Sequence, residues 1–201
     1  VLFRSVNEEA PLWMLEQLSI DQNVVFPTTN SGYGVGESES FCDENSPLRP
    51  ISDYATAKVK VEEAYLQKGN SVSFRLATVF GMSPRMRMDL LVNDFVYRAV
   101  KDRFIVLFEE HFRRNYIHIR DVAGVFSFGI DNFSNMKGQS FNVGLSTANL
   151  TKMQLCERIK DHVPTFEIYV SAIGKDPDQR DYVVSNEKIE SLGWAPRYTL
   201  D

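Results

Sequence analysis

The sequence predicts an α/β fold with a largely parallel sheet. Three observations support this prediction: amphipathic helical segments recur along the chain, short runs of β-branched and aromatic residues lie between them, and glycine- or proline-containing loops separate the two kinds of segment. Such alternation is typical of βαβ units, in which helices cover parallel strands. With 201 residues, 43% of them hydrophobic, the chain is long enough to bury a core.

The first part of the chain predicts two helices with a strand between them. Apolar residues at helical spacing indicate a helix over 10–18, where Pro11 lies near the tolerated start. A short apolar run indicates a strand over 23–27, and a polar, glycine-containing loop follows it. The next helix covers 53–67 and ends at the stop signal Lys68-Gly69-Asn70.

The rest of the chain continues the alternation. β-branched and aromatic residues predict a strand over 71–80. Thr151, with Gln154 three residues later, forms a capping box that opens a helix over 152–162. The remaining predicted elements are helices over 88–102, 120–133 and 186–194 and strands over 103–108, 115–119 and 165–170.

Composition excludes several classes of partner. A net charge of -5 argues against a nucleic-acid polyanion, and no apolar run approaches the ~18 residues of a membrane span. Cys42 and Cys156 lack metal-ligand spacing, as do the three histidines, so we expect reduced thiols and no metal site. Without a signal-peptide pattern, we expect a cytoplasmic protein. The chain starts without methionine, which favours a truncated sequence with linker at residues 1–5.

Tyr54 and Lys58 are candidates for an acid–base pair. On the predicted helix they are four residues apart and share one face. A free tyrosine, with a pKa of about 10, is a poor base at neutral pH, whereas a neighbouring ammonium favours the phenolate. Because tyrosine–lysine pairs at this spacing are common by chance, an exposed helical face is the alternative reading. The context decides between the two.

Six motifs supply that context. They are "TTNSGYG" after a predicted strand, "ENSPLRPISDYATAK", "RLATVFG", "RNYIHIRDVA", "FNVG" and "LGWAPRYTL". In this order they resemble the extended short-chain dehydrogenase/reductases, specifically the NAD-dependent sugar-nucleotide epimerase/dehydratase family and most closely its UDP-galactose 4-epimerase branch. The resemblance runs from about Asn7 to the end of the chain.

The resemblance implies an architecture. It implies a Rossmann-like parallel sheet with helices on both faces, whose first βαβ unit is missing, plus a small C-terminal α/β substrate-binding region. Residues 1–80 would form the remainder of the NAD-binding domain with the catalytic threonine, tyrosine and lysine. Residues 81–201 would be mostly the substrate-binding region, with 115–133 returning to the first domain.

The resemblance also implies roles for individual residues. The family's catalytic residues fall on Thr29, Tyr54 and Lys58, and these three together with Asn7 and Ala77 would contact NAD. The nucleotide sugar would be bound by Thr78, Arg85, Arg87, Arg114, Tyr116, Lys175 and Asp178. At Lys175 the family has an arginine, and Arg180 competes for that role.

The residues after Thr29 bear on the reaction. In the family's 4,6-dehydratases an acid pair follows this threonine, whereas here Asn30 and Ser31 follow it and neither is a general acid or base near neutral pH. Epimerisation, or simple oxidation and reduction at one carbinol, is therefore favoured over dehydration, although an acid from elsewhere in the fold would restore it. A non-catalytic scaffold is the second alternative, and the presence of Thr29, Tyr54 and Lys58 together favours an enzyme.

Two further expectations follow from the resemblance. The family's "GxxGxxG" loop has no counterpart, since the glycines at 32–36 have another spacing and precede no amphipathic helix. We therefore expect the 201 residues alone to bind NAD poorly and to be inactive. Family members commonly dimerise through two helices per subunit, here those at 10–18 and 53–67, so we expect the intact enzyme to be a homodimer with Trp13 or Tyr65 near the two-fold axis. For the 201 residues alone, the alternative is that the missing N-terminal unit covers this surface within one subunit.

Overall fold

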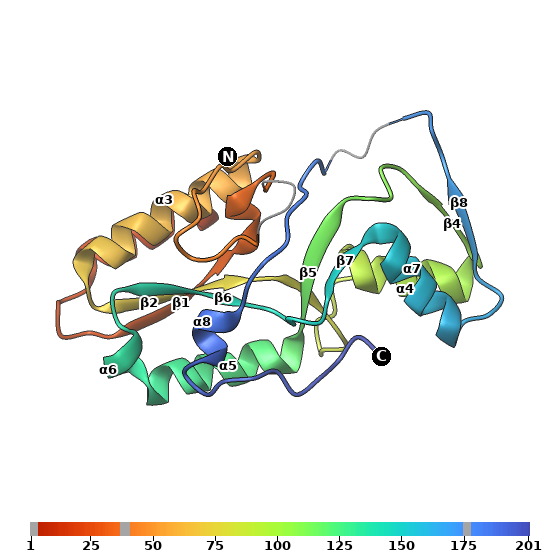
Figure 1. Ribbon diagram of the computed structural model, residues 1–201. Helices are drawn as coiled ribbons and strands as arrows, with labels where there is room; N and C mark the ends of the chain where they lie inside the picture. The colour runs from red at the N-terminus through yellow and green to blue at the C-terminus, as the bar shows by residue number, and fades with distance from the viewer. Residues whose placement is uncertain (1–3, 37–40, 175–177) are drawn as a thin grey trace.

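A three-stranded parallel sheet lies at the centre of one half of the molecule. The computed structural model describes residues 4–36, 41–174 and 178–201. α3 (Asp53–Lys68) covers one face of the sheet, and α5 (Ile119–Asp131) and α6 (Phe133–Met136) lie on the other (Figure 1). Helices on both faces of a parallel sheet are what the sequence predicts. The strands, in spatial order, are β1 (Val24–Thr29), β2 (Ser71–Leu76) and β6 (Gln139–Val143).

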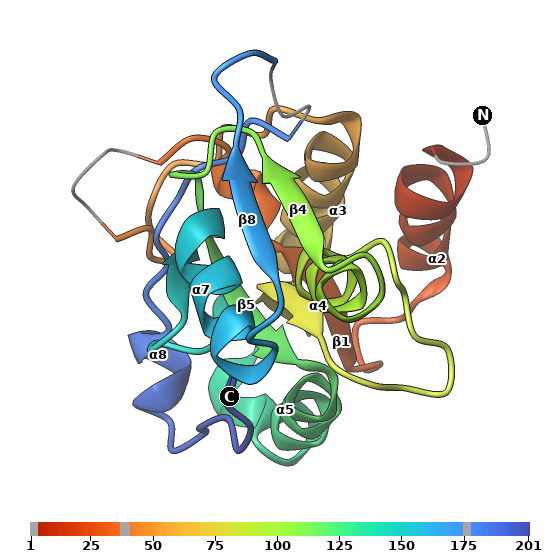
Figure 2. The same ribbon diagram turned by 90° about the vertical axis from the view of Figure 1, so that its right-hand side faces the viewer.

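The other half of the molecule is built on two smaller sheets. The first pairs β3 and β5 in parallel and β5 and β7 antiparallel, and the second is a parallel pair, β4 and β8, which faces the viewer in Figure 2. α4 (Leu91–Lys101) and α7 (Lys152–His162) pack beside them. The strands are β3 (Thr78–Phe80), β5 (Arg113–His118), β7 (Asn149–Thr151), β4 (Phe104–Leu107) and β8 (Glu167–Val170).

Each half has its own hydrophobic core. The core of the first sheet contains Phe74, whose ring meets Phe126 edge-on at a centroid distance of 5.4 Å. The core of the second half gathers Phe80, Phe95 and Phe166 from different elements. Residues of α5 and α8 (Glu187–Glu190) pack into the first core although they lie late in the sequence.

The predicted strand over 71–80 is two strands, because the chain leaves the first sheet at Ala77. The N–H of Ala77 donates to the carbonyl of Val143 at 2.9 Å, which keeps it with β6. The next residue, Thr78, instead pairs with Tyr116 of β5. A single residue therefore carries the chain from one sheet to the other, a change that β-propensity cannot reveal.

Local signals set several element ends as expected. The Thr151 hydroxyl accepts from the N–H of Gln154 at 3.1 Å, and the Gln154 side chain accepts from the N–H of Thr151 at 2.9 Å, which confirms the capping box. Gly69 ends α3 at φ 81°. The helix expected over 88–102 begins only at Leu91, and the one expected over 186–194 is helical only over Glu187–Glu190.

The N-terminal segment packs against α3. It consists of a π-helical turn, η1 (Ser5–Glu9), and α2 (Ala10–Gln17), neither of which has a buried residue. The Tyr65 hydroxyl donates to the carbonyl of Pro11 at 2.8 Å, and its side chain is buried under α2. Tyr65 is thus covered within the chain, whereas Trp13 is 62% exposed, and the position of either residue near a two-fold axis stays a prediction.

Membrane-spanning helices and metal-binding clusters are both absent from the described residues. None of their helices combines the length and apolarity that crossing a membrane demands. No group of histidine, cysteine or acidic side chains in these ranges has an arrangement suited to a metal ion. Cys42 and Cys156 are both buried and form no disulfide.

Candidate active site

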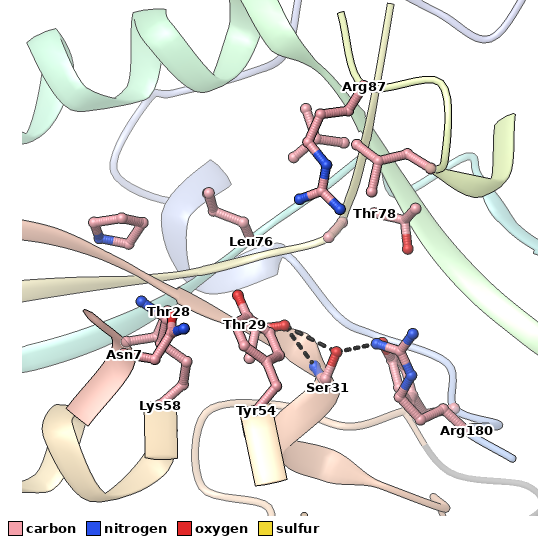
Figure 3. Close-up of a pocket in the computed structure, with 15 residues that line it drawn as sticks. Asn7, Thr28, Thr29, Ser31, Tyr54, Lys58, Leu76, Thr78, Arg87 and Arg180 are labelled. Atoms are coloured by element: carbon pink, nitrogen blue, oxygen red, sulfur yellow. Dashed lines mark hydrogen bonds between the residues drawn. The ribbon is translucent and has the colours of Figure 1, made fainter. Parts of the chain in front are cut away.

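A cavity of about 620 Å³ opens where β1 and β2 end beside α3 (Figure 3). The carboxyl ends of parallel strands are the usual ligand position in open α/β sheets. Figure 3 shows Asn7, Lys58 and Tyr54 on one side of the cavity, with Leu76 and Arg87 across from them. The lining residues are Asn7, Pro27, Thr28, Thr29, Ser31, Tyr54, Lys58, Leu76, Ala77, Thr78, Val79, Arg87, Leu90, Arg180 and Tyr182.

The end of β1 places two hydroxyl groups in this cavity. Thr29 is the last residue of the strand, and its side chain accepts from the N–H of Ser31 at 3.1 Å, which starts the 3₁₀ turn η2 (Asn30–Tyr33). Gly34 ends the turn at φ 68°, where a Cβ would lie 2.0 Å from the carbonyl oxygen of Arg49. Only glycine fits there. The "YG" of the motif therefore fixes the turn that presents Thr29 and Ser31.

The start of α3 supplies Tyr54 and Lys58. The Ser52 hydroxyl caps this helix by accepting from the N–H of Ala55 at 3.2 Å. One helical turn separates Tyr54 from Lys58, and the Lys58 ammonium lies 6.0 Å from the centre of the Tyr54 ring. Both side chains line the cavity, so Tyr54 and Lys58 share one face of the helix, as their spacing predicts.

Burial is the largest influence on the pKa of each member of the pair, although Tyr54 is 37% exposed. Burial raises the pKa of Tyr54, while the charges of Arg180 and Arg87 and a hydrogen bond with Thr29 act against that rise. Burial also lowers the pKa of Lys58. The net shift of Tyr54 is upward, so the expected fall in its pKa beside Lys58 is not what the structure gives. The cations that favour its phenolate most are arginines from other elements.

A second tyrosine–lysine pair has the same spacing but lies on an exposed helical face. Lys101 donates to the Tyr97 hydroxyl at 2.6 Å on the exposed side of α4. Neither residue lines the cavity that contains Tyr54. Spacing alone does not separate the two pairs, whereas position in the fold does.

Ser31 and Arg180 extend the site beyond the predicted catalytic residues. The Thr29 and Ser31 hydroxyl oxygens are 2.9 Å apart, and the Arg180 guanidinium donates to the Ser31 hydroxyl. Arg180 also binds both carboxylate oxygens of Asp178. Figure 3 shows Thr29, Ser31 and Arg180 joined in a row. The one sequence signal for Arg180 is a basic residue close to Asp178 where the family has an Arg-x-x-Asp pattern.

Asp178 binds a second arginine as well. Its carboxylate lies 3.0 Å from the guanidinium of Arg114. Burial opposes the charge of Asp178, but hydrogen bonds and charge from Arg180 and Arg114 outweigh it and lower its pKa to about 2. The three side chains also line an adjoining cavity of about 190 Å³, with Thr78 between the two cavities.

The other predicted substrate-binding residues are dispersed. Arg87 lines the main cavity and pairs with Asp89, whereas Arg85 is exposed and does not line it. Tyr116 is fully buried in the second core, and its hydroxyl has no hydrogen-bond partner within the described structure. Lys175 lies outside the described residues.

The described part of the cavity wall contains no carboxylate. None of its fifteen described lining residues is an aspartate or glutamate. Asn30, at the position where dehydratases of the family have an acid, is fully buried, and neither of its amide atoms has a partner among the described residues. This side chain therefore lies behind the cavity wall.

A buried ion pair fixes α3 to the sheet behind the site. Glu62 of α3 is bound by the guanidinium of Arg75 on β2 at 2.6 and 2.9 Å. Its second oxygen accepts from Thr28 at 2.7 Å and from Ser73 at 2.6 Å. Since Thr28 precedes Thr29 and Glu62 shares a helix with Tyr54, this network sets the distance between the two catalytic candidates.

Comparison with known proteins identifies a family and several curated proteins that this chain resembles. The model of the NAD dependent epimerase/dehydratase family matches residues 6–144. Among curated proteins, the dTDP-D-glucose 4,6-dehydratase of Mus musculus is 27% identical over 88% of this chain and 52% of its own length. The CDP-paratose 2-epimerase of Salmonella typhi is 23% identical over 96% of this chain and 66% of its own.

Solved structures show the same Rossmann-like fold. The UDP-glucose 4-epimerase of Thermus thermophilus, a complex with NAD, has a TM-score of 0.80 at 24% identity, over 98% of this chain and 66% of that one. The dTDP-glucose 4,6-dehydratase of Bacillus anthracis, also with NAD, has a TM-score of 0.80 at 20% identity, over 96% and 63%. The chain spans about half to two thirds of the length of these relatives.

Proposed function

Because the chain belongs to the NAD dependent epimerase/dehydratase family, we propose that it carries the catalytic residues of an NAD-dependent epimerase, or a related oxidoreductase, acting on a nucleotide-activated sugar. The observation that carries this proposal is the meeting of Thr29, Tyr54 and Lys58 in one cavity at the carboxyl ends of β1 and β2. Residues 1–80 would belong to the cofactor domain and 81–201 mostly to the substrate region, with 115–133 returning to the former.

The residues in the cavity fit a nicotinamide nucleotide. The Lys58 ammonium is half-buried, faces the cavity and forms no ion pair with a described residue. An ammonium in this position suits the hydroxyl oxygens of a ribose, and Asn7 and Ala77 line the wall beside it. When bound, NAD would accept a hydride from the sugar carbon, and its reduced form would later return the hydride to that carbon.

Tyr54 would act as the base. As phenolate it takes the proton of the sugar hydroxyl. The carbinol becomes a ketone once the hydrogen on the same carbon has also left, as a hydride. Thr29 would hydrogen-bond the same hydroxyl and fix its direction. In the return step Tyr54 gives the proton back, and a keto sugar that has turned over in the cavity is reduced on its other face.

The cavity wall favours epimerisation over dehydration. Removing water from a sugar needs an acid and a base at neighbouring carbons in addition to Tyr54. The described wall offers no carboxylate, and Asn30 is buried behind it. Dehydratase, reductase and non-catalytic scaffold are the alternatives.

A turnover assay distinguishes these candidates. The protein that carries this sequence is incubated with NAD and, in turn, UDP-glucose, UDP-galactose and UDP-glucuronic acid, and the products are separated by anion-exchange chromatography. A C4 epimer without net oxidation supports the proposal. A dehydrated product supports the dehydratase, and a net oxidised sugar formed together with NADH supports the reductase running in reverse. No turnover of any of them with bound NAD supports the scaffold.

A further inference from the structure

The hydroxyl of Ser31 carries a proton that no described residue accepts. Its oxygen accepts twice, from the Thr29 hydroxyl at 2.9 Å and from the Arg180 guanidinium. A serine hydroxyl has two acceptor positions and one proton, so both acceptor positions are filled. Ser31 is buried, at 3% exposure, but lines the main cavity, and its proton is left to point into that cavity. Figure 3 shows the bonds from Thr29 and Arg180 meeting at Ser31.

The two bonds that Ser31 accepts make it a strong hydrogen-bond donor. The charged Arg180 polarises the O–H bond of Ser31, and a hydrogen bond that an oxygen accepts strengthens the one that it donates. A buried donor without a partner costs free energy, which a ligand oxygen in the cavity would offset. An oxygen that only accepts suits this position best, and the oxygens of a carboxylate are of that kind.

The charges in the cavity wall favour an anion. Three cations line the main cavity, Lys58, Arg87 and Arg180, and none of its described lining residues is acidic. Arg180 shares the carboxylate of Asp178 with Arg114, so one negative charge serves two guanidinium groups. The adjoining cavity differs, because the described residues that line it include as many carboxylates as cations. These are Asp89, Asp94 and Asp178 and Arg114, Lys152 and Arg180.

Arg87 is available to a ligand in the main cavity. Its ion pair with Asp89 is exposed, with 63% and 66% of the two side chains accessible, and such pairs contribute little free energy. Exchanging Asp89 for the carboxylate of a ligand therefore costs little. Figure 3 places Arg87 across the cavity from Tyr54, so an anion held by Arg87 would lie on the substrate side of the candidate base.

The position of Ser31 indicates which part of the substrate carries the charge. Ser31 is one hydrogen bond away from Thr29, which in the proposed function binds the reacting hydroxyl, so Ser31 reaches a substituent of a neighbouring ring carbon. For a reaction at C4 these neighbours are C3, with a neutral hydroxyl, and C5, which bears C6. The pyrophosphate is attached at C1, across the ring from C4. A carboxylate beside Ser31 is therefore an oxidised C6.

We propose that the substrate is a nucleotide-activated hexuronic acid, whose C6 carboxylate accepts from the Ser31 hydroxyl and is balanced by Arg180 and Arg87. The proposal rests on the proposed function, since it takes the sugar to lie in the main cavity with C4 at Tyr54. It makes Ser31 and Arg87 specificity-determining residues. At the position where the family's dehydratases have an acid, Ser31 holds C6 by a hydrogen bond.

A binding measurement without turnover tests this proposal. The full-length enzyme with Tyr54→Phe, which is expected to be inactive, is saturated with NAD and titrated by calorimetry with UDP-glucuronic acid and with UDP-glucose. The two ligands differ only in the oxidation state of C6. We expect UDP-glucuronic acid to bind at least about tenfold more tightly, the effect of one hydrogen bond to a charged group.

Two variants and a matched control locate the carboxylate. In the same background, Ser31→Ala and Arg87→Met should each weaken the binding of UDP-glucuronic acid about tenfold, and that of UDP-glucose by clearly less, because a neutral acceptor gains less from either donor. Arg85→Met removes a nearby exposed arginine that does not line the cavity and should leave both affinities unchanged. Equal thermal unfolding temperatures show that the variants are folded.

Three outcomes would overturn the proposal: UDP-glucuronic acid that binds no more tightly than UDP-glucose, no binding of either ligand, or a preference that neither variant reduces. An enzyme that epimerises UDP-glucose and does not prefer UDP-glucuronic acid keeps the proposed function and loses the carboxylate site. A preference for UDP-glucuronic acid in a protein whose wild type turns over neither ligand keeps the carboxylate site and refutes the function.

Discussion

The ammonium group of Lys58 lies 6.0 Å from the centre of the Tyr54 ring, with both side chains in the wall of one cavity. If Tyr54 is the base, Tyr54→Phe in the full-length enzyme, not in the 201 residues alone, should lower turnover by ~10² or more, because removing a general base normally costs that much. NAD binding should change little. Steady-state kinetics and NAD titration measure the two effects.

Tyr97→Phe is the matched control for that experiment. Tyr97 and Lys101 have the same spacing on α4 but lie outside the cavity. Turnover of the Tyr97 variant should equal that of the wild type. A Tyr54→Phe variant that keeps turnover within about tenfold of the wild type would contradict the assignment of the base.

The lowered pKa of Lys58 predicts the alkaline limit of activity. Burial disfavours its ammonium form, so Lys58 loses its proton at a lower pH than an exposed lysine, and activity that needs the charge falls as pH rises through that point. Lys58→Arg keeps a charge at any accessible pH. Its kcat/KM should be lower at neutral pH but should persist further into the alkaline range. An unchanged alkaline limb in this variant would show that another group sets it.

The buried pair of Glu62 and Arg75 predicts a large stability effect. Both side chains are almost fully buried, at 3% and 7% exposure, so Glu62→Gln leaves the Arg75 charge without a counterion. We expect a loss of about 3–5 kcal/mol in the free energy of unfolding, measured by urea denaturation. Asp94→Asn, which breaks the exposed pair with Arg98, should cost no more than about 0.5 kcal/mol. Similar losses in the two variants would mean that the buried network does not hold α3.

NAD binding by the 201 residues themselves is expected to be weak. The sequence has no GxxGxxG loop, the element that holds the dinucleotide pyrophosphate in this family. Calorimetry at micromolar protein should therefore give no measurable heat of NAD binding. Tight binding would place the dinucleotide elsewhere on the chain.

The outer face of α2 predicts a homodimer. Trp13 is 62% exposed on a helix with no buried residue, beside exposed Met14, and a second copy is the simplest cover for such a stripe. Sedimentation at tens of micromolar should show a dimer that Trp13→Glu dissociates. Val100→Glu changes an equally exposed residue, at 64%, on α4 and should leave the dimer intact. A monomeric wild type rules the prediction out.

Local chemistry explains which parts of the fold were predictable. The capping box at Thr151, the stop at Gly69 and the alternation of elements depend on neighbours in sequence, and the structure confirms them. The break at Ala77 depends on a hydrogen bond with Val143, which no local pattern contains. For the same reason β7 escaped prediction: three residues form a strand only because β5 lies beside them.

The candidate site likewise has features that the sequence predicts and features that it does not. Motif positions brought Asn7, Thr29, Tyr54, Lys58 and Ala77 to one cavity, as the resemblance implied. The charge environment was not predictable, since the cations that act on Tyr54 come from segments far along the chain. Tyr116 is a contrasting case, because its motif match could not reveal that the side chain points into a core.

The crossing at Ala77 makes the size of that residue a limit on the space inside the cavity. A methyl side chain there lies in the cavity wall on one side, and on the other lies 3.1 Å from where a Cβ on Gly144 would be. A longer side chain at position 77 has no room toward Gly144, because the Asn115 side chain fills that space: its Oδ1 would lie 1.5 Å from a Cβ added to Gly144. It must grow into the cavity instead. Homologues that accept sugars of different bulk are therefore expected to differ at this crossing while keeping the same proton-transfer residues.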